Sequence, residues 1–313
     1  MRLGFLYAGQ GSQKIGMGKD LYENNPCFRE NFDALKPHLR EMAFEGPMEA
    51  LSDTKNTQPV MVSFAIAVTE CLREKGIVPE IVAGLSLGEY SALYAANVFD
   101  RKTALELVSF RGIEMEKAAL GVDSKMVAVM GLTRKQVLDA VNTAAEKTGE
   151  VVAAANFNCP GQIVVGGQRK GVDLLVSLAK YLGAKRCIEL KVSGPFHTAL
   201  MEPAGNALKE KFREVTFGNM EIPVLFNCTG RPLQEGDTIE QLLEQQVKSS
   251  VYFQDTIEYM RNLGIDTILE IGPGKALAGF VKKTSPEITV FSIEDITSME
   301  EAIEAIIRQK GEA

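Results

Sequence analysis

The sequence contains no tryptophan, only two histidines, and five cysteines that form no CxxC pair. Dispersed cysteines in odd number are typical of reduced thiols and argue against a disulfide framework or a zinc site. The first ten residues are too short and too rich in glycine for a signal peptide. We therefore expect a cytoplasmic protein that holds no metal.

Long apolar runs are also missing, and no run approaches the length of a membrane span. The most apolar stretch, residues 59–71, is interrupted by Ser63, Thr69 and Glu70 and predicts a buried helix. The formal net charge of −7 argues against nucleic acid as the main partner, because phosphate binding needs a basic surface. We expect neither a membrane nor nucleic acid as a partner.

Short apolar runs alternate with amphipathic stretches of helical length, which indicates an α/β fold. The 313 residues are enough for one large domain or for two unequal lobes. Outside the middle third, we expect strands at residues 3–8, 81–84, 222–227, 266–271 and 288–293, and helices at 58–75, 87–97 and 101–119.

The middle third of the chain has a different order of elements. Strands are expected at 125–130, 151–157, 162–165 and 185–190, and helices at 133–147 and 169–182. This β-α-β-β-α-β order is typical of a ferredoxin-like arrangement. We predict a small ferredoxin-like lobe at residues 123–194, inserted into a large α/β lobe formed by residues 1–122 and 195–313. A cleft between two lobes is a natural place for a substrate.

Ser86 lies in a Gly-x-Ser-x-Gly pattern between an apolar run and a helical pattern. The pattern alone is weak evidence, but its setting is that of the nucleophile elbow of α/β-hydrolase-like lobes, where a tight turn exposes the serine hydroxyl. The N–H of Leu87 opens the helix and can donate to a developing oxyanion. The structural alternative is a glycine-rich helix start with a capping serine. We predict that Ser86 is a nucleophile and that the large lobe has a parallel sheet.

A serine nucleophile needs a base, and the chain offers two histidines. His38 lies in a charged segment that we expect to be solvated. His197 lies in a loop with glycine and proline, directly after the last strand expected in the small lobe. Catalytic groups concentrate on loops held by a rigid scaffold, so His197 is the predicted base, although a loop histidine with a structural role is the alternative.

Residues 9–13, Gly-Gln-Gly-Ser-Gln, follow the first expected strand. Ligands of open α/β sheets bind beyond the carboxyl ends of strands, where the amide of Gln10 can orient a carbonyl or an oxyanion. The GxGxxG spacing of a dinucleotide site is absent, and residues 272–275, Gly-Pro-Gly-Lys, lack the GxxxxGK[ST] pattern of a phosphate loop. These patterns argue against a nucleotide site.

Six motifs together resemble the malonyl-CoA:acyl carrier protein transacylases in order and spacing, over nearly the whole chain. They are GQGSQ at 9–13, GLSLGEY at 84–90, RG at 111–112, NFNCPGQ at 156–162, PFH at 195–197 and EIGPG at 270–274. The resemblance implies that Ser86 becomes malonylated, that His197 is the base, and that Gln10 and the N–H of Leu87 form the oxyanion hole.

The resemblance also implies residues that bind the substrate or orient the base. Arg111 matches the arginine that pairs with the malonyl carboxylate, and a guanidinium can hold a carboxylate with two parallel hydrogen bonds. Gln246 matches the glutamine whose backbone carbonyl orients the histidine, with Gln245 as the alternative register. Phe196 matches the residue that marks malonyl-selective members, and Asn156 is expected to contact the substrate. A helix-surface position is the structural alternative for Arg111.

The implied reaction moves a malonyl group from malonyl-CoA to the phosphopantetheine thiol of acyl carrier protein, with ping-pong kinetics and in the service of fatty acid synthesis. Coenzyme A is then a substrate, and no cofactor is implied. We expect a monomer that receives an acidic carrier protein on a basic patch, for which Lys275, Lys282 and Lys283 are candidates. Leu85 departs from the family, because many relatives have histidine before the nucleophile.

Three alternatives remain at this point. A serine thioesterase or esterase would use the same nucleophile and base with water as the acceptor, but it would need neither Arg111 nor the inserted lobe. A trans-acting acyltransferase of a polyketide synthase is hardly separable from the fatty acid enzyme by sequence. An inactive docking subunit disagrees with the intact Ser86, His197 and Arg111.

Overall fold

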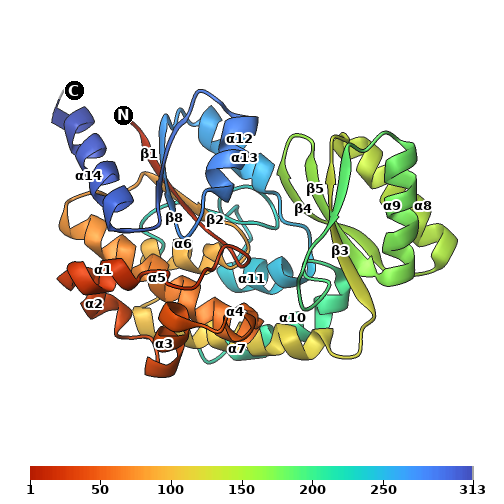
Figure 1. The fold of residues 1–313 in the computed structure, drawn as a ribbon. Helices are drawn as coiled ribbons and strands as arrows, with labels where there is room; N and C mark the ends of the chain where they lie inside the picture. Colours follow the sequence, from red (N-terminus) through yellow and green to blue (C-terminus); the bar gives the residue numbers. More distant parts are fainter. Residues whose placement is uncertain (312–313) are drawn as a thin grey trace. The chain divides into compact units, whose positions relative to one another are not determined.

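The computed structural model describes residues 1–311. Contacts within the chain divide it into two compact units, each built from separate segments, and both are drawn in Figure 1. The first unit comprises Met1–Gly112, Val215–Leu225 and Ile257–Ala313, and the second comprises Ile113–Glu214 and Phe226–Thr256. The second unit thus takes in more of the chain than residues 123–194. A separate inserted lobe with those boundaries stays a prediction.

A five-stranded sheet forms the centre of the first unit, in the order β7-β2-β1-β8-β9. All neighbouring strands run parallel, which confirms the predicted parallel sheet. The central strands β1, β2 and β8 are buried along their whole length, as is usual for parallel strands covered on both faces. The strands are β1 (Leu3–Tyr7), β2 (Ile81–Gly84), β7 (Val224–Leu225), β8 (Thr267–Ile271) and β9 (Thr289–Ile293).

Helix α5 (Thr54–Glu74) is the long helix that the apolar stretch at 59–71 predicts. Every residue from Thr57 to Thr69 is buried, and a helix that is apolar on all sides belongs inside a core. In Figure 1 it lies near the sheet with α6 (Gly88–Ala95). The other helices of this unit are α1 (Lys19–Asn24), α2 (Pro26–Phe32), α3 (Pro37–Glu45), α4 (Met48–Ser52), α13 (Ala276–Thr284) and α14 (Ile296–Gly311).

Two helices cross the division between the units. Helix α7 (Arg101–Ala119) belongs to the first unit up to Gly112, and α12 (Phe253–Asn262) belongs to it from Ile257. The site residue Arg111 therefore lies on the part of α7 that belongs to the first unit.

The second unit contains the predicted β-α-β-β-α-β series. The elements are β3 (Ser124–Met130), α8 (Arg134–Thr148), β4 (Val152–Cys159), β5 (Gln162–Gln168), α9 (Arg169–Tyr181) and β6 (Arg186–Glu189). The strands form one antiparallel sheet in the order β4-β5-β3-β6. The predicted order of elements is confirmed, and Thr133 caps α8 through a capping box with Gln136.

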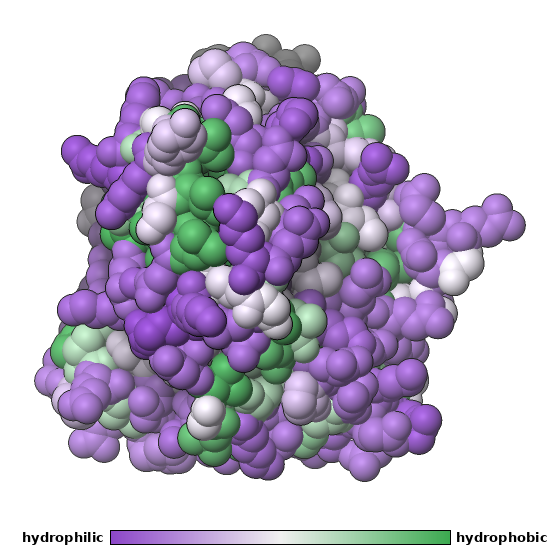
Figure 2. All heavy atoms as spheres, turned by 90° about the vertical axis from the view of Figure 1, so that its right-hand side faces the viewer, coloured by the Kyte–Doolittle hydropathy of each residue, from purple (hydrophilic) through white to green (hydrophobic). Residues whose placement is uncertain are grey.

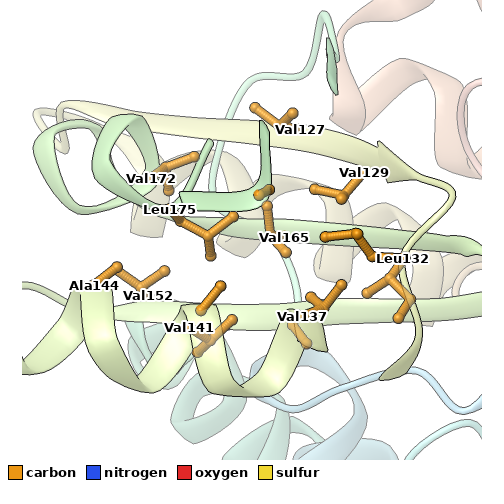
Figure 3. Packing of buried hydrophobic residues seen from close by; sticks show 14 of the residues in the cluster. Val127, Val129, Leu132, Val137, Val141, Ala144, Val152, Val165, Val172 and Leu175 are labelled. Carbon is orange, nitrogen blue, oxygen red and sulfur yellow. The ribbon is translucent and has the colours of Figure 1, made fainter. Parts of the chain in front are cut away.

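A close-packed apolar layer joins α8 and α9 to one face of this sheet. Figure 3 shows Val129 and Val165 of the strands pointing towards Val141 of α8 and Leu175 of α9. Each of these side chains is at most 7% exposed. Alternating apolar residues on the strands meet helices whose apolar positions recur at helical spacing, which fixes the register of the sheet.

Two further helices and a short 3₁₀ turn complete the second unit. They are η1 (Ala199–Met201), α10 (Glu202–Phe212) and α11 (Ile239–Lys248). The face drawn in Figure 2, which is the right-hand side of Figure 1, carries apolar residues scattered among hydrophilic ones. Across residues 1–311, no helix combines the length and the apolar character that a membrane crossing requires.

Candidate active site

Ser86 occupies the turn between β2 and α6 with a φ of 52°, in the left-handed region. Few non-glycine residues adopt this conformation, and those that do concentrate at functional sites. The N–H of Leu85 donates to the carbonyl of Tyr7 at 3.0 Å, so the turn is tied to the end of β1. The predicted setting of strand, tight turn and helix is therefore present.

The glycines on either side of Ser86 are required by backbone packing. A Cβ at Gly84 would lie 2.0 Å from the carbonyl carbon of Gly88, and one at Gly88 would lie 2.2 Å from the carbonyl oxygen of Tyr7. A Cβ at Gly9 would lie 2.4 Å from the carbonyl oxygen of Leu85. Rigid backbone cannot yield at these distances, so the Gly-x-Ser-x-Gly pattern follows from the close approach of β2 to the start of α6 at Gly84 and of α6 to β1 at Gly88.

Leu87 and Gln10 lie at the carboxyl edge of the sheet, where β2 and β1 end. Leu87 immediately precedes α6, and backbone N–H groups at a helix start have no acceptor within the helix. The side-chain amide of Gln10 donates to the hydroxyl of Thr54 at 3.0 Å. Thr54 is completely buried and begins α5, so it anchors the amide. The Gly9–Gln13 loop thus meets the carboxyl edge that ligands of parallel sheets prefer.

Arg111 is 1% exposed, and its Nη2 donates to the Ser86 hydroxyl at 3.2 Å. Its guanidinium carbon lies 5.5 Å from the ring centroid of Tyr90. Burial lowers the pKa of Arg111, while charge interactions with Tyr90 and Glu89 oppose this shift. An arginine is rarely buried to this degree unless its charge is used or compensated, so the helix-surface alternative for Arg111 is wrong.

Gly112 lets α7 approach the start of α5 at the position next to Arg111. A Cβ at Gly112 would lie 2.9 Å from both the Cα of Lys55 and the carbonyl oxygen of Thr54. Both atoms belong to backbone, which leaves no room for a side chain. The absence of a side chain at Gly112 therefore lets α7, which carries Arg111, lie close to Thr54 at the start of α5.

His197 lies in the second unit, is 3% exposed and has a φ of 59°. Its ring Nδ1 lies 2.8 Å from the backbone carbonyl oxygen of Gln246, and its backbone N–H donates to the carbonyl of Val247 at 3.2 Å. Both carbonyls lie in the last turn of α11, where no N–H group of the helix is left to donate to them. A carbonyl can only accept, so Nδ1 carries the proton and Nε2 is the basic nitrogen.

Phe196 and Asn156 also belong to the second unit. Phe196 is 7% exposed, and its Cε1 would lie 3.3 Å from a Cβ at Gly194. Asn156 is 9% exposed and lies at a register shift of β4, where a short parallel bridge joins it to Val251. The neighbouring Phe157 N–H donates to the Val251 carbonyl at 2.8 Å.

The predicted site residues therefore form two groups. Ser86, Arg111, Gln10 and Leu87 come together in the first unit, and the second group is His197, Gln246, Asn156 and Phe196. The pairing of Ser86 with His197 stays a prediction. His38 is exposed on α3, as expected for a solvated residue. No group of three or more histidine, cysteine or acidic residues suited to a metal occurs within residues 1–311.

Two residues near the site escaped the sequence reasoning. Thr54, the anchor of Gln10, begins α5 one residue after the cap of α4, and no sequence pattern marks it. Glu89 lies inside the motif at 84–90, but only its complete burial distinguishes it from a solvated first-turn acid. The candidate docking lysines Lys275, Lys282 and Lys283 are exposed at the two ends of α13, and their role stays a prediction.

Comparison with known proteins places this geometry in a wider context. A family described as acyl transferase domain matches residues 4–308. The malonyl CoA-acyl carrier protein transacylase of Bacillus subtilis is 41% identical, over 100% of this chain and 99% of that protein. Its counterpart in Escherichia coli K12 is 36% identical, over 96% of this chain and 98% of that protein.

Solved structures agree with the sequence comparison. A malonyl CoA-acyl carrier protein transacylase from Clostridium perfringens superposes with a TM-score of 0.94 at 36% identity, covering 99% of this chain and 98% of that one. The transacylase PlMCAT, solved in complex with the type II polyketide acyl carrier protein AntF, gives a TM-score of 0.93 at 34% identity, covering 97% of this chain and all of that one.

Proposed function

The chain belongs to the acyl transferase family together with the malonyl CoA-acyl carrier protein transacylases, and on that premise we propose that it moves malonyl from malonyl-CoA to acyl carrier protein for fatty acid synthesis. The observation that carries the proposal is the buried Arg111, whose Nη2 donates to the Ser86 hydroxyl at 3.2 Å. A nucleophile beside a buried cation suits an acyl group that ends in a free carboxylate.

In the first half of the proposed reaction, Nε2 of His197 takes the hydroxyl proton while Ser86 Oγ attacks the thioester carbonyl. The N–H of Leu87 and the amide of Gln10 stabilise the tetrahedral oxyanion. The C–S bond then breaks, the thiol of coenzyme A leaves with the proton from His197, and malonyl-Ser86 remains. All groups in this scheme belong to the chain or to its substrates, so the proposal needs no cofactor.

The second half repeats these steps in reverse. The phosphopantetheine thiol of the carrier protein gives its proton to His197 and attacks the malonyl-serine ester, and Ser86 regains its proton when the ester C–O bond breaks. The coenzyme A thiol that leaves in the first half and the carrier thiol that attacks in the second are chemically alike, so one site serves both halves. Ping-pong kinetics follow from this scheme, whereas an obligatory ternary complex would contradict it.

Arg111 holds the malonyl carboxylate in this proposal, and Gln246 keeps the imidazole in the tautomer that accepts a proton at Nε2. Phe196, directly before His197, restricts the space for an α-methyl branch, and Asn156 contributes to the substrate pocket. Leu85 replaces a histidine of many relatives, and His197 alone suffices for proton transfer. The cytoplasmic location, the monomeric state and the inserted lobe at 123–194 stay predictions.

The decisive experiment is incubation with malonyl-CoA, followed by mass spectrometry of the intact protein and of the peptide that contains Ser86. We expect a malonyl adduct on Ser86 that disappears when carrier protein with a free phosphopantetheine thiol is added. The Ser86→Ala variant is the matched control and should carry no adduct. Folded wild-type protein that stays unmodified would refute the proposal.

A second candidate is malonyl supply to a polyketide carrier protein. The 34% identity with PlMCAT, whose structure contains the type II polyketide carrier AntF, favours this possibility. The chemistry at Ser86 would be the same, so the two roles differ only in the acceptor. Comparing kcat/KM for a fatty acid carrier protein and a polyketide carrier protein separates them.

A further inference from the structure

Glu89 is completely buried, although it is a carboxylic acid in the first turn of a helix. It lies three positions after Ser86, and its N–H donates to the Ser86 carbonyl at 3.1 Å. Acidic side chains are almost never fully buried without a compensating partner, because removing a carboxylate from water is costly. The burial of Glu89 therefore points to a specific charge partner.

Arg111 is the buried cation beside it, because its guanidinium bonds to Ser86, three positions before Glu89, and lies 5.5 Å from the ring of Tyr90, the next residue. Burial lowers the pKa of Arg111, and the charge interaction with Glu89 is one of the effects that oppose this lowering. Of the two residues that oppose the lowering, only Glu89 carries a carboxylate. Tyr90 is a neutral phenol, because burial raises its pKa. The two buried charges therefore balance one another.

The serine turn and the first turn of α6 together make three contributions around the guanidinium. The hydroxyl of Ser86 accepts from Nη2, the ring of Tyr90 lies 5.5 Å from the guanidinium carbon, and Glu89 between them supplies the charge. A guanidinium has more N–H donors than one substrate carboxylate can accept, and in a buried site the others need partners as well. A buried carboxylate on α6 compensates the charge, while Nη2 is the donor directed at Ser86.

We propose that Glu89 is a positioning residue, which keeps Arg111 buried and directed at Ser86 and thereby gives the enzyme its selectivity for acyl groups with a free carboxylate. This inference rests on the proposed function, because it assumes that Arg111 binds the malonyl carboxylate. Without Glu89, the buried cation has lost its counter-charge, and the flexible arginine side chain leaves this position. The serine and its base are unaffected, so acyl groups without a carboxylate still react.

A purely structural role predicts a different outcome. A carboxylate near a helix N-terminus also interacts favourably with the helix dipole, and its loss would then weaken α6 and the serine turn as a whole. Damage to the turn would slow the transfer of every acyl group alike. The ratio of malonyl to acetyl transfer therefore distinguishes the two roles, because only the positioning role changes it.

The test measures acylation of Ser86 by malonyl-CoA and by acetyl-CoA in wild type, Glu89→Gln, Glu89→Asp and Arg111→Ala. We expect Glu89→Gln to lower kcat/KM for malonyl-CoA by about 10- to 100-fold, the range caused by misplacing a binding group by about an ångström. Acetyl transfer should change less than about threefold on the same reasoning. Glu89→Asp, which keeps the charge, should recover part of the selectivity.

The outcomes separate this inference from the function on which it rests. If Arg111→Ala abolishes the malonyl preference and Glu89→Gln leaves it intact, only the role of Glu89 is refuted. Equal losses for both acyl groups in Glu89→Gln, or no recovery in Glu89→Asp, also refute it. If Arg111→Ala itself leaves the malonyl preference unchanged, Arg111 does not bind the carboxylate and both proposals for these residues fail. Should Glu89→Gln not fold, the folded Glu89→Asp must still show a reduced malonyl preference.

Discussion

His197 Nδ1 lies 2.8 Å from the carbonyl oxygen of Gln246, in the last turn of α11. The backbone N–H of the same histidine donates to the carbonyl of Val247, the next carbonyl along the helix. One residue thus satisfies two carbonyls that the helix end leaves without donors. The negative end of the helix dipole also favours an imidazole that takes up a proton, which is what a general base does during the reaction.

The first prediction follows from the fact that His197 is oriented by the backbone carbonyl of Gln246 and not by its side chain. Gln246→Ala keeps the carbonyl that accepts from His197, so kcat should stay within about threefold of wild type. The side chain of Gln246 is completely buried, and its truncation should lower stability by about 1–3 kcal/mol. Steady-state kinetics and thermal unfolding test both parts. A loss of kcat as large as in His197→Ala would show that the side chain, not the carbonyl, orients the base.

Phe196 gives a prediction about branched substrates. A methyl group in a tight pocket is worth about 1–3 kcal/mol, so kcat/KM should favour malonyl-CoA over methylmalonyl-CoA by about 10- to 200-fold. Phe196→Ala opens space beside His197 and should reduce this ratio, even if the overall rate also falls. Equal kcat/KM values for the two thioesters in wild type would rule out steric selection at this position.

Thr54 is expected to act on catalysis through Gln10. Thr54→Val keeps the shape but removes the acceptor for the Gln10 amide, so the amide is no longer fixed for the oxyanion. We expect kcat to fall by about tenfold with little change in KM, since the interaction matters in the transition state. Thr57→Val is the matched control, because Thr57 lies on the same helix but donates its hydroxyl to the Leu51 carbonyl of α4 rather than bonding to Gln10. Similar kcat losses in both variants would point to general damage of α5.

The sequence predicted the elements of this site better than their contacts. Ser86 could be found because a glycine pattern coincided with the change from a strand to a helix. The expected helix at 58–75 exists but begins at Thr54, since a cap at the helix start has no apolar periodicity to mark it. The strand expected at 222–227 is reduced to Val224–Leu225, where the chain pairs with β2.

Contacts between distant segments account for what the sequence missed. The burial of Glu89 near Arg111 depends on how the arginine of α7 reaches Ser86 and Tyr90, and the bond from Gln10 to Thr54 joins a loop to the start of α5, 44 positions away. Local patterns carry no information about either pair. Arg111 itself was identified through the family resemblance, because an arginine on an amphipathic helix is ordinarily solvated.

Asp295 gives a prediction about pH and stability. Its carboxylate accepts from the Ser298 N–H at 2.8 Å at the start of α14, and hydrogen bonds from the side chain and backbone of Ser298 lower its pKa. The ionised carboxylate thus favours the folded state. Its contribution is complete above the unfolded pKa of about 3.9 and is lost as the pH falls through the lower folded-state pKa.

Asp295→Asn tests this sign, because asparagine can still cap the helix but carries no charge. The variant should be about 0.3–1 kcal/mol less stable than wild type at neutral pH, and the difference should shrink as the pH falls below about 3.9. Denaturant unfolding at several pH values measures it. A difference that grows towards acid pH would contradict the assignment.

Gly112 allows a test of whether the close packing of α7 against α5 controls the preference for malonyl over acetyl groups. Gly112→Ala places a methyl group 2.9 Å from the backbone of Thr54 and Lys55, so α7 must move away from α5 and carry Arg111 with it. Overpacking of this kind costs about 1–3 kcal/mol. The matched control is Gly279→Ala in α13, where nothing lies within 4 Å and alanine should stabilise the helix by about 0.5–1 kcal/mol. Gly112→Ala should therefore lower both the melting temperature and the ratio of malonyl to acetyl transfer, whereas Gly279→Ala raises the first and leaves the second unchanged. An unchanged ratio in folded Gly112→Ala would mean that Arg111 keeps its position without this close helix contact.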